Sequence, residues 1–306
     1  MNALAPLPTG AASRLVYFGT PEVAVPPLLA IHAAGFRIDL VVTRPDNRRG
    51  RGTVRTPSAV KEVATDLGIP ISHELGDAAD LANGDALLGV VVAYGRLLPL
   101  SLLSAVPMVN VHYSLLPRWR GAAPVERAIL AGDQRIGVCI MRVVEALDMG
   151  DVYRRTDLEI RTEDTAHSLR DRLCAQSIPL LIDVLSSGAG VGEPQVGEPT
   201  YAAKITAKDL LFDWSKPAEQ LMRITRVGVG FTYFRGKRLN IRIARIVDAP
   251  TSGEPGKFIE LDANGIVVAT GQGSICLQTV QPEGKPVLDS ISWSRGARLI
   301  PGELFG

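Results

Sequence analysis

Two polar side chains at the end of one short apolar run could carry out group-transfer chemistry. Asn110 and His112 are two residues apart, so on an extended strand they project from the same side. A side-chain amide and an imidazole that converge on one point can polarise a carbonyl group and move a proton. The spacing alone equally fits a strand-terminal asparagine that caps a turn beside an exposed histidine, and this explanation stays open.

The residues that follow His112 cannot continue a regular element. Pro117, Gly121 and Pro124 punctuate the stretch, and proline and glycine at such spacing interrupt helices and strands alike. We therefore expect a shaped loop at the carboxyl end of the strand that carries Asn110 and His112.

A third candidate, Asp148, lies in a glycine-bearing loop at residues 146–151. Aspartate in such a loop is usually a turn former. It gains a chemical role if the fold brings it to His112, where a carboxylate would orient the ring and raise its basicity. Sequence spacing does not decide between these two interpretations.

These candidates lie in a region where short aliphatic runs alternate with amphipathic helical patterns. Runs of four to six β-branched or aliphatic residues between helices indicate strands that are covered on both faces, which is typical of a parallel α/β sheet. Ligands of such sheets bind beyond the carboxyl ends of the strands. The expected strands are residues 14–18, 38–42, 89–93, 108–111 and 137–141.

The turn Gly19-Thr20-Pro21 after the first expected strand lacks the G-x-G-x-x-G pattern of dinucleotide-binding folds. Pro21 also removes a backbone donor. A strand-to-helix turn with proline near the helix start explains this segment better, and a dehydrogenase is thereby disfavoured.

The texture of the sequence changes after residue 185. Residues 186–199 are rich in glycine, proline and small polar residues, which is typical of a linker. A helix is expected at 217–226, followed by short strands at 239–246, 257–261, 265–269 and 274–280, which predict a small barrel or sandwich. We therefore expect a first domain at 1–188, a linker at 189–208 and a C-terminal domain at 209–306.

The composition narrows the class of protein. The chain has 306 residues, 46% of them hydrophobic, and a formal net charge of +1, which is enough for two cores and excludes a wholly basic nucleic-acid coat protein. Cys139, Cys174 and Cys276 are scattered, which argues against a disulfide scaffold or structural zinc site and suits a reducing compartment. No stretch approaches the ~20 apolar residues of a membrane span. We expect a soluble, cytoplasmic protein.

Two basic clusters stand out in this nearly neutral chain. Residues 44–55 hold five arginines against one acid, and residues 235–245 hold five lysines and arginines without an acid. Such clusters fit surfaces that follow nucleic-acid phosphates. Solvated charge on surface elements is the alternative.

The segment 110–124 resembles the folate-binding active-site loop of the 10-formyltetrahydrofolate-dependent formyltransferases, and Leu147-Asp148-x-Gly150-Asp151 resembles their catalytic aspartate loop. Within that family, the branch that acts on initiator tRNA is the most similar, and the resemblance extends over nearly the whole chain. Further matching stretches lie at residues 16–21, 44–46, 50–52, 91–95, 201–205, 213–215 and 284–286.

The resemblance implies a Rossmann-like parallel-sheet formyltransferase domain followed by a small OB-like β-barrel that binds tRNA. It implies transfer of a formyl group from 10-formyltetrahydrofolate to the amino group of methionine on initiator Met-tRNA, for translation initiation. Asn110 and protonated His112 would stabilise the oxyanion, and Asp148 would keep His112 charged and help remove the amine proton. No metal, no membrane and a monomer are expected.

The resemblance also assigns binding residues. Ser114, Leu115, Leu116 and Pro117 match the stretch that lines the folate site. Contacts with tRNA fall to the two basic clusters, at Arg44, Arg48, Arg49, Arg51, Arg235, Lys237 and Arg238.

Two rival functions stay open. A folate formyltransferase that acts on a sugar nucleotide or a glycinamide ribotide would share the catalytic trio but would not need the arginine-rich loop or a basic barrel. An RNA-binding regulator on an α/β scaffold would have no use for Asn110, His112 and Asp148 together, and a folate-binding titration discriminates it.

Overall fold

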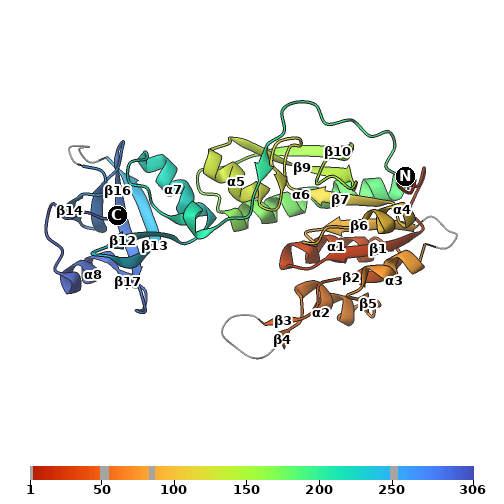
Figure 1. Cartoon of the computed structure of the whole chain (residues 1–306), viewed down its shortest axis with the longest axis horizontal. Coiled ribbons are helices and arrows are strands. Elements are labelled where there is room, and N and C mark those ends of the chain that lie inside the picture. Colours follow the sequence, from red (N-terminus) through yellow and green to blue (C-terminus); the bar gives the residue numbers. More distant parts are fainter. Residues whose placement is uncertain (1–2, 49–54, 83–86, 249–253) are drawn as a thin grey trace. The chain divides into compact units, whose positions relative to one another are not determined.

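The computed structural model describes residues 3–48, 55–82, 87–248 and 254–306 (Figure 1). The chain divides into unit 1, which comprises residues 1–125, 135–159 and 168–203, and unit 2, which comprises residues 126–134, 160–167 and 204–306. The expected division into 1–188, a linker at 189–208 and 209–306 differs from this one. Residues 189–203 group with unit 1, because they hydrogen-bond to its loops.

Among the described residues, unit 1 is built around a seven-stranded sheet in the order β10-β9-β7-β6-β1-β2-β5. The strands from β5 to β7 are parallel, which confirms the expected α/β sheet. β9 pairs antiparallel with β7, and β10 pairs antiparallel with β9. The sequence pattern did not predict this direction, because a hydrophobic run indicates that a strand is buried but not which way it runs. The bounds are β1 Arg14–Gly19, β2 Ile38–Val42, β5 Ile71–Ser72, β6 Leu87–Val92, β7 Met108–His112, β9 Arg135–Arg142 and β10 Val152–Glu159.

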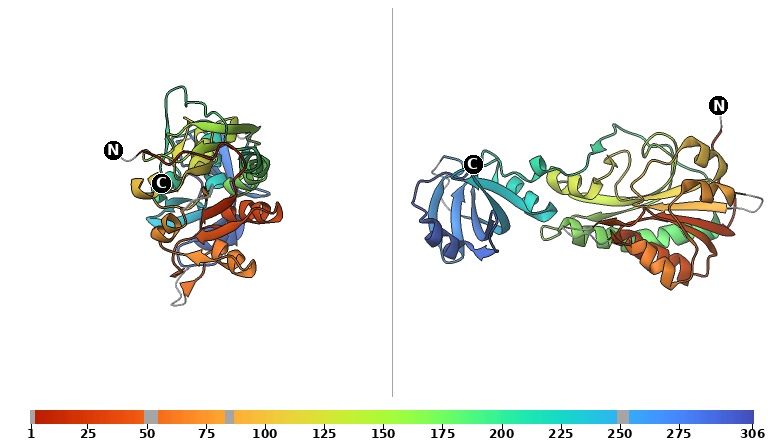
Figure 2. Two further views of the ribbon diagram at one scale, coloured as in Figure 1. Left: turned by 90° about the vertical axis from the view of Figure 1, so that its right-hand side faces the viewer. Right: turned by 60° about the horizontal axis from the view of Figure 1, so that its bottom comes forward.

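Helices cover both faces of this sheet (Figure 2). Val16 and Phe18 of β1 face a cluster that includes Ala78 of α3 and Leu103 of α4. The alternate residue Tyr17 points to the other face, where its hydroxyl donates to the carbonyl oxygen of Ala24 at 2.6 Å, just before α1. The helices are α1 Val25–Ala33, α2 Ala59–Asp66, α3 Leu75–Asp80, α4 Leu100–Ala105, α5 Pro124–Ala131 and α6 Ala166–Ser187.

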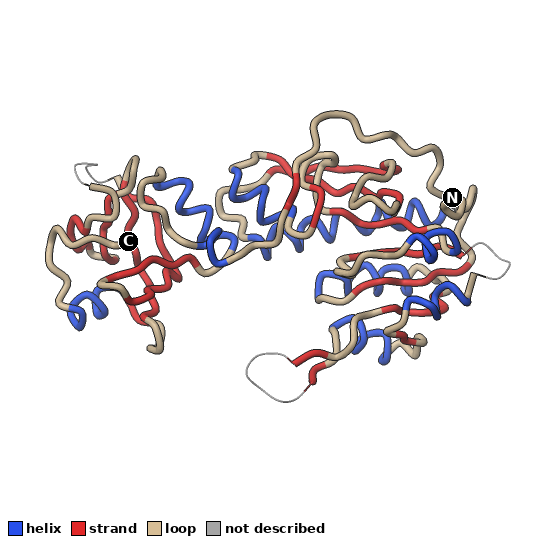
Figure 3. Tube along the Cα trace, viewed as in Figure 1, coloured by secondary structure: helices blue, strands red, loops and turns tan. Residues whose placement is uncertain are grey.

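After α6 the chain runs mainly as loop (Figure 3), but it is packed against unit 1. Glu193 forms a β-bridge with Val152 of β10. Further on, β11 (Tyr201–Ala202) pairs in parallel with β8 (Arg120–Gly121). The segment that resembles a linker in composition therefore belongs to unit 1.

The described strands of unit 2 form an antiparallel sheet in the order β12-β13-β16-β15-β14, with β17 beside β16. Phe305 bridges Phe234 of β12, and Leu304 bridges Lys257 beside β14. Residues 304 and 305 thus join the two edges, which agrees with the expected small barrel. The elements are β12 Gly230–Phe234, β13 Lys237–Val247, β14 Phe258–Asp262, β15 Gly265–Ala269, β16 Ser274–Pro282, β17 Leu288–Asp289, α7 Ala218–Val227 and α8 Ser290–Ala297.

Part of α5 belongs to unit 2. Leu130 packs against the core of unit 2, and Arg127 pairs with Asp209 at 2.6 Å. Asp209 lies in the 3₁₀ helix η2 (Ala207–Leu210). The boundary between the two units therefore does not follow the order of the sequence, because α5, which lies between strands of unit 1 in the chain, supplies apolar surface to the core of unit 2. None of the described helices has the length and apolar character needed to cross a bilayer.

Candidate active site

The candidate catalytic side chains lie at the carboxyl ends of the parallel strands. β7 ends at His112, and Asn110 lies beside Val91 of β6. At the same edge, the Thr20 hydroxyl after β1 donates to the carbonyl oxygen of Tyr94 after β6, at 3.3 Å. Open α/β sheets bind their ligands at this edge, so the strand pattern placed Asn110 and His112 where a ligand would meet them.

The fold brings Asp148 to His112. Asp148 lies in the turn between β9 and β10, and its Oδ2 is 3.7 Å from Nδ1 of His112. The two side chains are 12% and 6% exposed, so solvent screens an interaction between carboxylate and imidazolium only weakly. Sequence spacing left this proximity open, and the tertiary structure supplies it.

The two ring nitrogens of His112 have different surroundings. Nε2 lies 2.9 Å from the carbonyl oxygen of Trp119, and because a carbonyl accepts but never donates, Nε2 must carry a proton. The distance of 3.7 Å from Nδ1 to Asp148 is longer than a hydrogen bond. Nδ1 therefore faces a counter-charge and is open to a bound group.

The carboxylate of Asp148 is held from the neighbouring loop. The backbone N–H of Gly121 donates to Oδ2 at 2.8 Å, which fixes the direction of the carboxylate. Asp148 itself has φ +52°, a left-handed conformation that is uncommon for residues other than glycine. Strain of this kind persists where surrounding contacts enforce it.

The amide of Asn110 is available to a ligand. Asn110 is half-buried, and the described residues offer its side chain no hydrogen-bond partner. The imidazole of His112 and the carboxylate of Asp148 thus meet at the end of β7, and the amide of Asn110 lies on the same strand two residues before His112. Such a set can stabilise a developing oxyanion and accept a proton from a nucleophile.

The residues expected to line a folate site lie on the loop after β7. Ser114 is fully buried, and its hydroxyl donates to the carbonyl oxygen of Arg118 at 2.6 Å. Leu116 is buried in a small apolar cluster of unit 1. Leu115 and Pro117 are half-buried. Ser114 and Leu116 therefore shape the loop from within, and Leu115 and Pro117 are better placed to meet a ligand.

The cysteines are not poised as nucleophiles. Cys139, Cys174 and Cys276 are buried, and burial raises the pKa of each thiol, that of Cys276 to about 11. A thiol of this kind stays protonated at neutral pH. In the described parts of the chain, no group of three or more His, Cys, Asp and Glu side chains is arranged to hold a metal ion.

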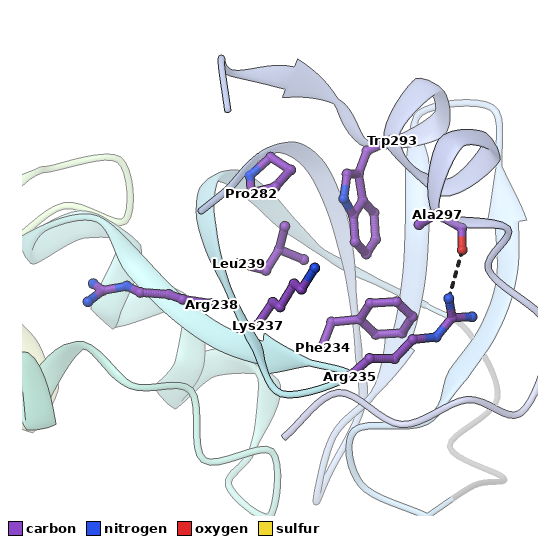
Figure 4. A pocket seen from close by; sticks show the side chains of 8 residues that line it. All are labelled: Phe234, Arg235, Lys237, Arg238, Leu239, Pro282, Trp293 and Ala297. Atoms are coloured by element: carbon purple, nitrogen blue, oxygen red, sulfur yellow. Dashed lines mark hydrogen bonds between the residues drawn. The ribbon is translucent and has the colours of Figure 1, made fainter. Parts of the chain in front are cut away.

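A pocket of about 260 Å³ lies at the turn between β12 and β13 of unit 2 (Figure 4). Arg235 is engaged within it, because its guanidinium donates to the carbonyl oxygen of Ala297 at 2.9 Å and to the Glu303 carboxylate at 2.6 Å. Lys237 is exposed and forms no ion pair with a described residue. The lining residues are Phe234, Arg235, Lys237, Arg238, Leu239, Pro282, Trp293 and Ala297.

The arginine-rich loop is described only in part. Arg44 is exposed after β2, and its backbone N–H donates to the Thr20 hydroxyl at 3.4 Å. Arg48 lies in the short strand β3 (Asn47–Arg48), which pairs with β4 (Arg55–Thr56). Arg49 and Arg51 lie outside the described residues.

The sequence analysis missed several residues that surround Asn110, His112 and Asp148. Trp119, with φ +63°, supplies the carbonyl oxygen that meets His112, and the hydroxyl of Thr200 accepts from the backbone N–H of Trp119 at 2.8 Å. Gln195 contacts the turn that carries Asp148. Backbone groups leave no signal in side-chain patterns, and Gln195 and Thr200 lie in or beside the segment with linker composition.

Comparison with known proteins places both units in one family. A model described as formyl transferase matches residues 13–185, and a model described as formyl transferase, C-terminal domain, matches residues 204–298. A methionyl-tRNA formyltransferase of Coxiella burnetii is 40% identical, with 96% of this chain and 99% of that protein covered. One of Heliobacterium modesticaldum is 39% identical, with 96% and 100% covered.

Solved structures share the fold at lower identity. WlaRD, a sugar 3N-formyl transferase, superposes with a TM-score of 0.66 at 16% identity, over 90% of this chain and 100% of that one. HypX from Aquifex aeolicus in complex with tetrahydrofolic acid gives 0.60 at 15% identity, over 92% of this chain and 46% of that one. At these identities the likeness establishes the fold alone.

Proposed function

The chain belongs to the formyl transferase family, and we propose that it transfers the formyl group of 10-formyltetrahydrofolate to the amino group of methionine on initiator tRNA. The observation that carries this proposal is the match along both units, over 96% of the chain, to methionyl-tRNA formyltransferases such as those of Coxiella burnetii and Heliobacterium modesticaldum. The co-substrate is 10-formyltetrahydrofolate, and the product is the formylated Met-tRNA that begins translation.

Asn110 and His112 are proposed to stabilise the oxyanion of this reaction. When the neutral amine attacks the formyl carbon, the formyl oxygen gains negative charge. The free amide of Asn110 and the Nδ1–H of protonated His112 donate to that oxygen. Because Nε2 of His112 is engaged with the Trp119 carbonyl at 2.9 Å, the ring keeps its orientation while Nδ1 does this work.

Asp148 is proposed to balance the charge of His112 and to accept the proton that the attacking amine loses. Its Oδ2 is already directed by the Gly121 N–H. The bond between the formyl carbon and N10 of the folate then breaks, and N10 takes up a proton as it leaves. Atoms and charge balance without an oxidant, a reductant or a metal.

The two substrates are proposed to use different elements. The loop with Leu115 and Pro117 contributes to the folate site, while Ser114 and Leu116 hold its shape from within. The tRNA phosphates meet the basic clusters of the arginine-rich loop and of the β12–β13 turn. In the second cluster Lys237 is the strongest candidate, because Arg235 is already paired with Glu303.

A sugar formyltransferase is the alternative function, and WlaRD, an enzyme of that kind, shares the fold with a TM-score of 0.66, although at 16% identity this likeness concerns the fold alone. The match of residues 204–298 to the C-terminal domain of formyl transferases, together with the basic cluster in that region, supports tRNA as the acceptor instead.

The test is a formylation assay with purified protein, 10-formyltetrahydrofolate and initiator Met-tRNA. We expect formyl-Met-tRNA to accumulate with enzyme, and no product when a nucleotide-linked amino sugar replaces the tRNA. Formylation of the sugar but not of the tRNA would overturn the proposal.

We propose in addition that the protein acts as a monomer in the cytoplasm. The expectation of a monomer is checked by light scattering on the purified chain at assay concentrations. A mass near twice 32.7 kDa would contradict it.

A further inference from the structure

The turn that carries Asp148 needs an external support. Asp148 has φ +52°, a left-handed backbone that glycine adopts without cost and that aspartate adopts where surrounding contacts support it. Its side chain is nonetheless directed at His112, with Oδ2 3.7 Å from Nδ1. Something must therefore hold the backbone of this turn.

The side-chain amide of Gln195 contacts the turn at the strained residue itself and two residues beyond it. Nε2 of Gln195 donates to the carbonyl oxygen of Asp148 at 2.8 Å and to that of Gly150 at 2.8 Å. Both N–H groups of one amide are thus used on a single turn, which fixes two carbonyl groups relative to each other.

The other end of the same amide contacts the loop after β7. Oε1 of Gln195 accepts from Nε of Arg120 at 3.0 Å and from its Nη2 at 2.6 Å. Arg120 is 7% exposed, so these charge-assisted bonds form away from bulk water. The next residue, Gly121, donates its N–H to Oδ2 of Asp148.

These contacts form a closed circuit around the carboxylate. Asp148 is hydrogen-bonded to Gln195, and Gln195 to Arg120. Gly121, the residue after Arg120, is hydrogen-bonded back to Asp148. The strand pair β8–β11 anchors it, because Tyr201 and Ala202 pair with Arg120 and Gly121.

We propose that Gln195 is a positioning residue that holds Asp148 in register with His112. This inference rests on the proposed function for its kinetic part and on geometry alone for its structural part. A displacement of about 1 Å at a catalytic group can cost roughly 100-fold in rate, so the amide affects turnover although it does not touch the reacting atoms.

The central variant is Gln195→Met, which keeps the length of the side chain and removes all its hydrogen bonds. We expect kcat to fall roughly 10- to 100-fold with the KM for folate changed less than about threefold. Gln195→Glu should lose at least as much, because it keeps an acceptor for Arg120 but places oxygen against the carbonyl groups of Asp148 and Gly150.

A double variant separates positioning from general support of the fold. Because Gln195 acts through Asp148, adding Gln195→Met to Asp148→Asn should lower kcat by less than about threefold further. If Gln195 only supported the fold in general, Gln195→Met would lower kcat by the same factor in the unaltered protein and in Asp148→Asn. The matched control is Val196→Ala, a neighbouring side chain that is 87% exposed and should leave kcat unchanged.

A measurement without substrate keeps the two proposals distinguishable. In the free protein, Gln195→Met should speed hydrogen exchange at the Gly121 amide, which is bound to Asp148, by at least about tenfold, while exchange at the β16 amides of unit 2 stays at the rate seen in Val196→Ala. The thermal midpoint should fall, because buried Arg120 loses the acceptor of its side-chain hydrogen bonds. Unchanged exchange, or an undiminished kcat, would overturn the role of Gln195. Failure of the unaltered enzyme to formylate Met-tRNA would overturn the proposed function instead.

Discussion

The two nitrogen atoms of the His112 ring have different roles because their neighbours differ. Its Nε2 is engaged by the Trp119 carbonyl at 2.9 Å, and its Nδ1 faces Asp148 at 3.7 Å without a hydrogen bond. In the proposed reaction, a substrate oxygen can therefore accept a hydrogen bond from Nδ1–H while the Asp148 carboxylate balances the charge. A histidine with both nitrogens engaged would have to break a bond before it could act.

The trio should be individually indispensable. Asn110→Ala, His112→Ala and Asp148→Ala should each lower turnover by at least about 100-fold, because each removes an oxyanion donor or a proton acceptor that works only in this arrangement. Steady-state formylation of Met-tRNA measures the effect, and pairs of these changes should cost much less than the product of the single effects.

The control for Asp148 is Asp148→Asn. Asparagine tolerates the left-handed backbone that Asp148 adopts, so this variant removes the charge without adding strain, and its thermal midpoint should match that of the unaltered protein. Near-normal turnover in Asp148→Asn would show that the carboxylate neither balances charge nor accepts the proton.

The sequence pattern points to side chains with reactive groups. It does not point to residues that hold those side chains in place. The sequence singles out Asn110 and His112 as candidates because two polar residues interrupt an apolar strand end. Trp119 acts through its carbonyl oxygen, which every residue has. Gln195 is 47 residues from Asp148, and nothing in a local pattern encodes a contact at that separation.

At the level of elements, buried strands were predictable and exposed or very short ones were not. β2 and β15 coincide with the expected residues 38–42 and 265–269. β10, with the sequence VYRRTDLE, alternates between half-buried and exposed residues and lacks an aliphatic run. β8 and β11 have two residues each, too few for a periodicity, although they hold the loop that follows His112.

The turn between β9 and β10 should be sensitive to a single methyl group. A Cβ at Gly150 would collide with the carbonyl oxygen of Arg142, so Gly150→Ala must displace the backbone next to Asp148. We expect at least a tenfold fall in kcat in the formylation assay.

The matched control is Gly76→Ala in α3. A Cβ there meets no atom within 4 Å, and alanine is the better helix former by about 1 kcal/mol. Gly76→Ala should keep full activity and slightly raise the thermal midpoint. Equal activity of Gly150→Ala and Gly76→Ala would show that the turn accommodates displacement without a catalytic cost.

The attachment of α5 to unit 2 predicts a pH-dependent stability. The side-chain hydrogen bond from Arg127 lowers the pKa of Asp209 to about 2. A folded-state pKa below the unfolded value stabilises the protein at pH values above about 4, and this stabilisation disappears as the pH falls towards 2. We expect Asp209→Asn to lower the free energy of unfolding by about 1 to 2 kcal/mol at pH 7, because the pair is partly solvated.

Urea denaturation between pH 7 and pH 2 measures this effect. The difference between Asp209→Asn and the unaltered protein should shrink below pH 4. Asp248→Asn, an exposed change of equal charge in the same unit, serves as the control and should show no such trend. A constant difference down to pH 2 would assign the stabilisation to packing or to the cap of η2.

At the scale of the whole molecule, the net charge of +1 conceals two local excesses of positive charge. One belongs to unit 1, near residues 44–55, and the other to unit 2, at residues 235–245. A polyanion that binds both units would displace counterions from each, and the salt dependence of binding reports how many phosphates are neutralised. The proposed tRNA substrate can therefore be followed through its salt dependence without knowing which bases are read.

The arginine-rich loop gives the sharpest test of this picture. Changing Arg48, Arg49 and Arg51 to alanine should raise the apparent KM for tRNA and reduce the log-log salt slope by roughly 0.7 to 0.9 for each phosphate that the loop no longer neutralises. Folate affinity should stay the same, since the loop at Ser114 to Pro117 is a separate element.

Lys237→Ala in unit 2 should reduce the salt slope independently of the arginine-rich loop. The combined variant should show the sum of both reductions, because the numbers of counterions released at separate sites add. Arg235→Ala is the control within unit 2, because its guanidinium is held by Glu303 and its removal should lower the thermal midpoint more than the slope. An unchanged slope in the triple variant would show that this loop is solvated charge without a role in binding tRNA.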